Sequence, residues 1–217
     1  VFVEKPLALT LQDGQGLVEE ARKRSAILMV GHLLEYHPAV EEIEARVLSG
    51  ELGALQYIYS NRLNWGRLRR EESILWSFAP HDIAVILRLV GSTPTRVMAT
   101  GGAWIQPDVR DVTVTHMEFA GGIKAHLYVS WLHPHKEQRL VVTGDRNVLV
   151  FEDSAPDPER KLRRYSHSVD WEDHAPVARK APEEFLEYDR AEPLKQECLA
   201  FLDAIRTRKA PRTDGES

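Results

Sequence analysis

What this sequence lacks excludes several classes of protein. Cys198 is the only cysteine, so no internal disulfide can form, and a reducing cytoplasm is the expected location. No run of about 18 apolar residues is present, which argues against a transmembrane helix. The formal net charge of −5 provides no overall positive field for nucleic acid. We therefore expect no nucleic-acid partner and no membrane partner.

A glycine-rich phosphate-binding loop is also missing. The pattern Gly-x-Gly-x-x-Gly cradles the pyrophosphate of a dinucleotide, and it does not occur in the chain. The nearest pattern, Gly14-Gln15-Gly16, follows no strand and is interpreted as a surface turn. The chain opens on Val1-Phe2-Val3, which has the pattern of a strand already under way, so we expect a piece of a longer protein.

A βαβ unit is predicted at the start of the chain. The apolar runs at residues 1–3 and 27–31 have the length of buried strands, and a helix capped by Thr10 lies between them. The two strands of such a unit are expected to be parallel neighbours. Ligands bind at the carboxyl ends of strands in open α/β sheets, and these ends carry Lys5 and His32.

After about residue 50 the pattern changes. Alternation at residues 55–60 and later hairpin turns predict a mainly antiparallel sheet, with one face on a long helix and the other free. Residues 152–192 show no clean period and are expected to form a long loop or lobe edge. The predicted fold class is α/β followed by α+β. With 43% hydrophobic residues, the 217-residue chain can bury a substantial core.

The helix predicted at residues 75–90 organises the rest of the chain. Apolar residues recur there with the spacing of a buried helical face, at positions 83, 86, 87 and 90. Pro80 suits a first turn, so His81 is expected at the start of the helix. The positive helix end would keep its imidazole neutral and able to accept a proton. The alternative is a histidine that only caps or packs at a helix start.

Five motifs, taken in order, resemble those of the Gfo/Idh/MocA oxidoreductases. They are Glu4-Lys5-Pro6, the segment 31–40 beginning Gly31-His32, Leu75-Trp76 with Ala79-Pro80-His81-Asp82-Ile83, Ser130-Trp131-Leu132 with Pro134 and Lys136, and Pro193-Leu194 with Glu197, Phe201-Leu202 and Ile205. Within that family the motifs are most similar to those of UDP-N-acetylglucosamine, or its uronic acid, 3-dehydrogenases. The resemblance extends over nearly the whole chain.

The resemblance implies a division into three parts. Residues 1–36 would be the C-terminal part of an NAD(P)-binding Rossmann domain. Residues 37–192 would form a substrate and oligomerisation domain with a large, open, mainly antiparallel sheet. Residues 193–217 would be a helix and tail that pack back towards the Rossmann part. The family also implies a homodimer or homotetramer formed through the open sheet.

The chemistry that the resemblance implies is hydride transfer from a sugar-nucleotide carbon to NAD, or to NADP. His81 would take the proton of the sugar 3-hydroxyl, and Lys5 would hydrogen-bond the developing ketone oxygen or relay the proton. Glu4, Lys5, Pro6 and His32 would lie at the cofactor. Many relatives carry an aspartate one helical turn before the histidine, where this sequence has Ser77. A hydroxyl stabilises an imidazolium less well than a carboxylate does.

Substrate contacts are expected from a basic loop near residue 65 and from two later positions. The candidates are Arg62, Asn64, Arg67, Trp76 and Lys136. Forked arginine donors fit a diphosphate or a uronate, and an indole ring can stack on a sugar or on uracil. The alternatives are a solvated basic loop for the arginines and core packing for the tryptophan.

Two other functions stay open. Histidines at positions 116, 126, 133 and 135 could bind zinc or nickel, but the last two are expected in a loop, and no cysteine or paired carboxylate accompanies them. We therefore expect no metal. The second alternative is a non-catalytic lobe that binds a sugar nucleotide or a second copy of the chain, since the dinucleotide-binding glycine loop is absent.

Overall fold

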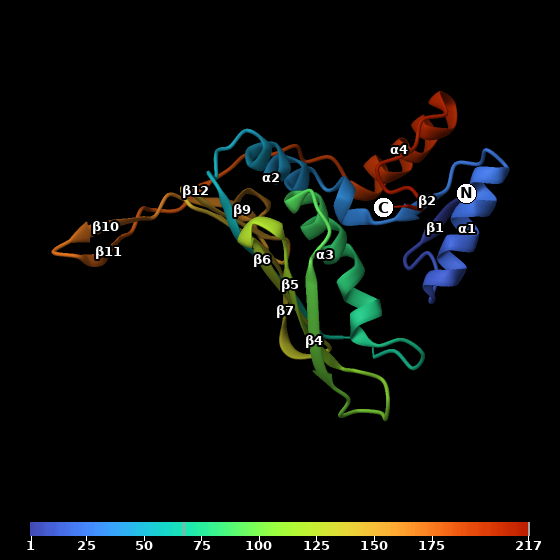
Figure 1. The fold of residues 1–217 in the computed structure, drawn as a ribbon, viewed down its shortest axis with the longest axis horizontal. Coiled ribbons are helices and arrows are strands. Elements are labelled where there is room, and N and C mark those ends of the chain that lie inside the picture. Colours follow the sequence, from blue (N-terminus) through green and yellow to red (C-terminus); the bar gives the residue numbers. More distant parts are fainter. Residues whose placement is uncertain (67, 217) are drawn as a thin grey trace. The chain divides into compact units, whose positions relative to one another are not determined.

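The computed structural model describes residues 1–66 and 68–216, so Arg67 and Ser217 lie outside the described residues. The chain divides into two compact units (Figure 1). Unit 1 combines residues 1–41 with 189–217, and unit 2 contains residues 42–188.

Unit 1 begins with the predicted βαβ arrangement. β1 (Phe2–Glu4) and β2 (Met29–Gly31) pair in parallel, and α1 (Leu11–Lys23) lies between them in the chain. The prediction that the first two strands are parallel neighbours is confirmed.

The structure corrects the prediction for Gly14 and Gly16, which lie inside α1 and not in a surface turn. The Asp13 amide donates a hydrogen bond to the Thr10 hydroxyl at 3.1 Å, so the helix begins before both glycines. An interior glycine costs roughly 1 kcal/mol relative to alanine, but it does not by itself end a helix.

The remaining elements of unit 1 are the short 3₁₀ helix η1 (Leu33–Tyr36) and α4 (Pro193–Thr207). The segment after α4 returns to β2, where the Val30 amide donates to the Thr213 carbonyl at 2.8 Å. The Thr213 hydroxyl donates back to the Val30 carbonyl at 2.7 Å. These bonds attach the end of the chain to the second strand.

Unit 2 is built on an eight-stranded sheet in the order β12-β9-β8-β7-β3-β6-β5-β4. Its strands are β3 (Leu55–Trp65), β4 (Arg96–Gly102), β5 (Val112–Glu118), β6 (Lys124–Ser130), β7 (Leu132–Gly144), β8 (Val148–Glu152), β9 (Leu162–Tyr165) and β12 (Glu184–Phe185). β3 and β6 pair in parallel, and the other neighbouring pairs are antiparallel. The short 3₁₀ helix η2 (Ala120–Gly122) makes the predicted turn between β5 and β6. The predicted fold class is confirmed.

Residues 152–192 contain more regular structure than predicted. Besides β9 and β12, they include the 3₁₀ helix η3 (Pro158–Arg160) and a separate hairpin of β10 (Ser168–Glu172) and β11 (Ala175–Arg179). The hairpin lies away from the eight-stranded sheet in Figure 1. Nearly all of its side chains are exposed, so the alternation of Val169 and Trp171 with polar residues in β10 does not mark a buried face.

α3 (Ile74–Val90) packs on one face of the sheet, against β3, β5 and β6. The prediction of a helix here is confirmed, but the prediction that Pro80 lies in its first turn, with His81 at its start, is wrong. The helix begins at Ile74, so Pro80 and His81 lie roughly two turns inside it. Proline in a helix interior removes one backbone hydrogen bond, and here the helix continues past it. Gly91 ends the helix in the left-handed conformation, with φ of 71°.

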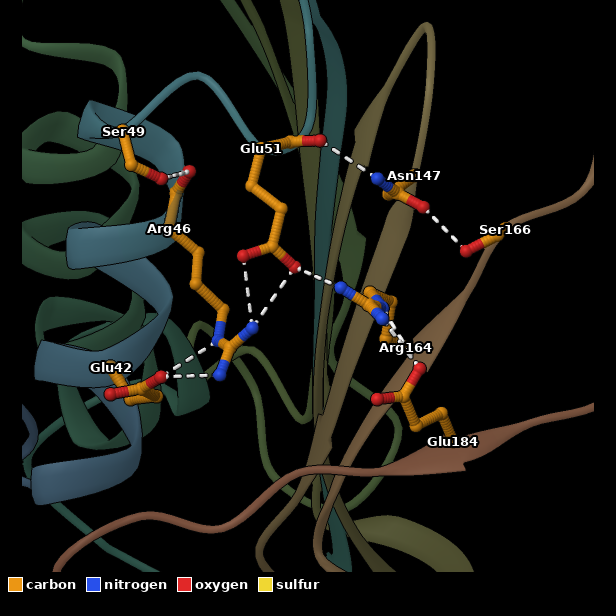
Figure 2. A network of polar contacts seen from close by, with 8 residues as sticks. All are labelled: Glu42, Arg46, Ser49, Glu51, Asn147, Arg164, Ser166 and Glu184. Carbon is orange, nitrogen blue, oxygen red and sulfur yellow. Dashed lines mark hydrogen bonds and ion pairs between the residues drawn. The ribbon is translucent and has the colours of Figure 1, made fainter.

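Charged side chains join α2 (Pro38–Leu48) to the β12 edge of the sheet (Figure 2). Arg46 pairs with Glu51 at 2.9 Å, and Arg164 of β9 pairs with both Glu51 at 2.7 Å and Glu184 at 2.6 Å. Burial alone would raise the pKa of Glu51, but hydrogen bonds from Arg164 and Arg46 lower it overall. The carboxylate of Glu51 therefore links the helix to β9, and Arg164 extends this link to Glu184 of the edge strand β12.

The four helices α1 to α4 contain between 11 and 17 residues. Within the described part of the chain, none of the helices has both the length and the apolar character that crossing a membrane requires.

Candidate functional site

The ends of β1 and β2 bring Lys5 and His32 to one edge of unit 1. Glu4, the last residue of β1, pairs with Gly31, the last residue of β2. Lys5 and His32 follow these two residues directly, and the peptide bond from Lys5 to Pro6 is cis. Because the strands are parallel, both residues emerge at the carboxyl edge, where open α/β sheets bind ligands. The structure thus brings together two of the predicted site residues.

The imidazole of His32 is affected by the charge of Lys5. Burial lowers the pKa of His32, and the positive charge of Lys5 lowers it further. A neutral imidazole has one N–H donor and one acceptor nitrogen. At neutral pH, His32 can therefore hydrogen-bond a ligand without adding a second positive charge next to Lys5.

Gly31 allows the side chains of β1 to lie close to β2. A Cβ atom at this position would be 3.2 Å from Oε2 of Glu4 and 3.4 Å from Cε2 of Phe2. Both side chains therefore lie on the same side of the strand pair, over Gly31. A larger residue at position 31 would displace Glu4, the residue immediately before Lys5.

Sequence reasoning assigned no role to Glu197, a buried carboxyl group in the same unit. Glu197 of α4 is 1% exposed, and its Oε1 atom has no hydrogen-bond partner among the described residues. Burial raises the pKa of Glu197 to about 7, and the negative charge of Glu4 adds to the shift. A signal was present in the sequence, because Glu197 lies four residues before Phe201 and therefore on the same face of this helix.

In unit 2, His81 lies well inside α3 and its Nδ1 atom is buried. Ser77 lies one turn earlier and is 8% exposed, so a buried hydroxyl stands where the resemblance expects an aspartate. The influence of a helix dipole falls off within the first turn. The prediction that the positive helix end acts on His81 is therefore wrong, because the helix begins at Ile74.

Arg62, predicted to bind substrate, has an internal partner. Its Nε atom donates to Oδ2 of Asp82 at 2.6 Å, and its side chain is 13% exposed. The Ser60 hydroxyl donates to Oδ1 of the same carboxylate at 2.6 Å. Burial alone would lower the pKa of Arg62, but the Asp82 carboxylate raises it overall. These contacts fasten β3 to α3, and a contact of Arg62 with substrate stays a prediction.

The other predicted substrate residues belong to unit 2, apart from Arg67, which lies outside the described residues. Asn64 is half-buried near the end of β3, and Lys136 is exposed on β7. Trp76 is 43% exposed at the start of α3, so its indole is not a core residue. Their exposure leaves Trp76 and Lys136 accessible to a ligand.

The histidines considered as metal ligands lie on strands. His126 stacks on Tyr59 with ring centroids 5.2 Å apart, and the Tyr57 hydroxyl lies 2.7 Å from Nδ1 of His126. Burial lowers the pKa of His126, and the charge of His116 lowers it further. Among residues 1–66 and 68–216, no three or more His, Cys, Asp or Glu side chains are grouped to hold a metal ion.

The segment 133–135 was predicted to be a loop, and this prediction is wrong. His133 and His135 belong to β7, which begins at Leu132. Pro134 between them suggested a loop, because proline cannot donate to a strand ladder.

Comparison with known families agrees with this arrangement of elements. Residues 40–150, more than half of the chain, match the GFO/IDH/MocA C-terminal domain. Residues 1–32 match the oxidoreductase family with an NAD-binding Rossmann fold. The chain belongs to the Gfo/Idh/MocA family. Within this family, the chain pairs a short Rossmann segment with the C-terminal domain.

Three similarities concern two dehydrogenases, one matched both by sequence and by structure. The UDP-N-acetylglucosamine 3-dehydrogenase of Acidithiobacillus ferrooxidans is 28% identical over 130 residues, which are 59% of this chain and 40% of the relative. A solved structure of that enzyme, GnnA, superimposes on this chain with a TM-score of 0.80 at 23% identity. The superposition includes 99% of this chain and 65% of the GnnA chain. The WlbA dehydrogenase from Bordetella pertussis, solved with NADH and UDP-GlcNAcA, has a TM-score of 0.75 at 16% identity, covering 100% of this chain and 64% of its own.

At these identities the two solved structures establish a shared fold and no more. In each of these comparisons the chain spans less than two thirds of the length of the other protein.

Proposed function

We propose that this protein is an NAD-dependent oxidoreductase that removes a hydride from a sugar nucleotide, with NADP as the alternative cofactor. The observation that carries the proposal is the position of Lys5 beside His32 at the carboxyl ends of β1 and β2. In open α/β sheets this edge is where ligands bind. Residues 1–32 match an NAD-binding Rossmann fold, so the ligand proposed for this edge is a nicotinamide cofactor.

The proposed substrate is UDP-GlcNAc or its uronic acid, oxidised at C3. Two relatives support this choice by their names: one is a UDP-N-acetylglucosamine 3-dehydrogenase, and the other was solved with UDP-GlcNAcA. In this chain, Asn64, Trp76 and Lys136 are the proposed substrate contacts. Lys136 is exposed and cationic, which suits a diphosphate or a uronate.

The residues present fit one end of a nicotinamide cofactor. Lys5 and a neutral His32 offer hydrogen-bonding groups at the strand ends, with Glu4 and Pro6 on either side of Lys5. These four residues would hold the cofactor, which when bound accepts the hydride. The sequence holds no glycine loop for the pyrophosphate, so this edge supplies only part of a dinucleotide site.

His81 and Lys5 are the proposed catalytic residues. His81 is the proposed general base, which takes the proton of the sugar hydroxyl at an imidazole nitrogen. Lys5 donates a hydrogen bond to the same oxygen as it becomes a ketone, which stabilises the developing charge. Ser77 supplies a hydroxyl where a carboxylate would stabilise the imidazolium more strongly.

The second candidate function is a non-catalytic lobe that binds a sugar nucleotide or a second copy of the chain. The absence of a glycine-rich pyrophosphate loop from the sequence favours it. Both candidates predict that the chain binds the sugar nucleotide, but only the oxidoreductase predicts that NAD strengthens this binding.

Calorimetric titration of the full chain with UDP-GlcNAc, and with its uronic acid, tests the proposal. Each titration is run with and without NAD, on the wild type, on Lys5→Ala and on the control Lys180→Ala, an exposed lysine. NAD-strengthened binding that Lys5→Ala loses and Lys180→Ala keeps supports the oxidoreductase. Binding without any effect of NAD supports the lobe. No binding by a folded chain contradicts both.

A further inference from the structure

α4 and β1 contact each other through a pair of aromatic side chains. The rings of Phe201 and Phe2 lie with centroids 5.4 Å apart. Glu197 precedes Phe201 by four residues and so lies on the same helix face. Glu4 follows Phe2 by two residues and so points to the same side of the strand, as the closeness of both to Gly31 shows. Glu197 and Glu4 thus lie on the two faces that carry this ring contact, and they are close enough for the charge of Glu4 to act on Glu197.

Both of these residues are acids, and Glu197 is buried. Glu197 is 1% exposed, and its Oε1 atom has no hydrogen-bond partner among the described residues. A buried carboxylate without a partner is costly, so the neutral acid is the form that fits this environment. Burial, with the nearby charge of Glu4, raises the pKa of Glu197 to about 7.

We propose that Glu197 is a positioning residue that acts through Glu4. In its neutral form it lets α4 pack on β1 and so holds the Glu4-Lys5-Pro6 segment in place, and its ionisation loosens this contact. The loosening is expected because two carboxylates would then face each other across the helix and the strand, one of them without solvent. Only the consequence for the chemistry of Lys5 rests on the proposed function.

Among the described residues, burial and the charge of Glu4 are the influences that raise the pKa of Glu197. β1 contributes Glu4, followed by Lys5, whose charge acts on His32. η1, which packs on α4, contributes the buried Glu35. The residues one turn before and after Glu197 on α4 are uncharged: Pro193, Leu194, Ala200 and Phe201.

The direction of the pH effect follows from linkage. When α4 is detached, Glu197 titrates near its ordinary pKa of 4.5, whereas in the packed state its pKa is about 7. Between these values the packed state holds a proton that the detached state has lost, so packing weakens as the pH rises. A little above pH 7 the packed state has also lost this proton, so the free energy of packing no longer changes with pH.

Hydrogen exchange of the α4 amides in the full chain measures this directly. The protection factor of the peptide 193–207, corrected for the intrinsic pH dependence of exchange, is followed from pH 5 to pH 8.5. In the wild type it should fall by about tenfold or more and level off above pH 7. Glu197→Gln imitates the neutral acid and should keep high protection throughout. Glu192→Gln, an exposed acid at the start of the same helix, is the control and should behave as the wild type.

A second readout follows the segment that Glu197 is proposed to hold. Acylation of Lys5 is measured relative to that of the exposed Lys180 over the same pH range. In the wild type the ratio should change as α4 loses protection, and in Glu197→Gln it should stay constant. A pH-independent protection factor, equal pH dependence in Glu197→Gln, or an unchanged Lys5 ratio would overturn the proposal. Neither readout uses substrate or cofactor, so failure here is separate from failure of the proposed function.

Discussion

Arg62 of β3 and Asp82 of α3 form a buried ion pair, with Nε and Oδ2 2.6 Å apart and Nη2 and Oδ1 3.3 Å apart. Asp82 directly follows His81, so the pair fixes α3 against the sheet next to the proposed base. The side chain that resembled a substrate ligand in the sequence thus anchors the helix that carries the histidine.

Arg62→Ala should destabilise the protein by about 3 kcal/mol, because it leaves the Asp82 carboxylate buried without its partner. Urea unfolding measures the change, with Arg70→Ala, an exposed arginine, as the matched control. In Arg62→Met/Asp82→Leu both charges are absent, and much of the stability should return. Unchanged stability of Arg62→Ala, with loss of sugar-nucleotide binding alone, would instead give Arg62 the substrate role predicted from the sequence.

His81→Gln should lower the rate of NADH formation from UDP-GlcNAc by about 10² to 10⁴, which is the usual contribution of a general base. Binding of the sugar nucleotide should be nearly unchanged, since glutamine keeps a hydrogen-bonding group on the helix. His174→Gln, on the exposed end of the β10–β11 hairpin, is the control. Equal rates for His81→Gln and the wild type would remove His81 from the mechanism.

His32 should make the protein less stable in acid. Burial and Lys5 lower its pKa in the folded state, so below about pH 6.5 the unfolded chain takes up a proton that the folded chain does not. The free energy of unfolding should therefore fall with decreasing pH, by at most about 1.4 kcal/mol per pH unit. Denaturation at pH 7 and at pH 5.5 should show this loss in the wild type but less of it in His32→Gln. An equal loss in both proteins would assign the acid sensitivity to other groups.

Arg164→Ala should lower the free energy of unfolding by less than about 1 kcal/mol. The pairs of Arg164 with Glu51 and Glu184 are partly exposed to solvent and screened by salt. The lowered pKa of Glu51 means that its contribution is present above the carboxyl pKa of the unfolded chain and is lost as the pH falls. Thermal unfolding at low and high salt should show a difference between wild type and variant that shrinks with added salt. A salt-independent difference would indicate packing by the arginine stem instead.

The face of the sheet opposite α3 is the proposed surface for self-association. Tyr59→Glu places a charge in the ring stack with His126 and should weaken dimers or tetramers by at least about tenfold. Sedimentation of the full chain over a concentration series measures this, with Gln15→Glu on α1 as a control with the same added charge. A wild type that stays monomeric at all concentrations would contradict the proposal.

Local patterns in the sequence account for what was predicted correctly. The helical spacing of apolar residues at 83–90 indicated α3, and two short apolar runs around a capped helix indicated the parallel pair β1 and β2. The motifs around Glu4-Lys5-Pro6 and His81 indicated the family. Each of these signals lies within a few neighbouring residues, where spacing and backbone preference act directly.

The wrong predictions also have physical causes. Pro80 was interpreted as a helix start, although a helix can continue through a proline. Pro134 was interpreted as part of a loop, although it lies in β7. The strands β10 and β11 were not predicted, because they are only five residues each and almost all of their side chains are exposed.

The sequence by itself determined the parallel pair, the hairpins of the sheet, the long helix and the family, because each follows from residues close together in the chain. Only the tertiary structure decided the partners of single charged residues. Arg62 meets Asp82 twenty positions later, and Glu197 is buried beside Glu4 at the other end of the chain. Burial and charge pairing depend on which distant segments pack together, and the same arginine or glutamate would behave differently on an open surface.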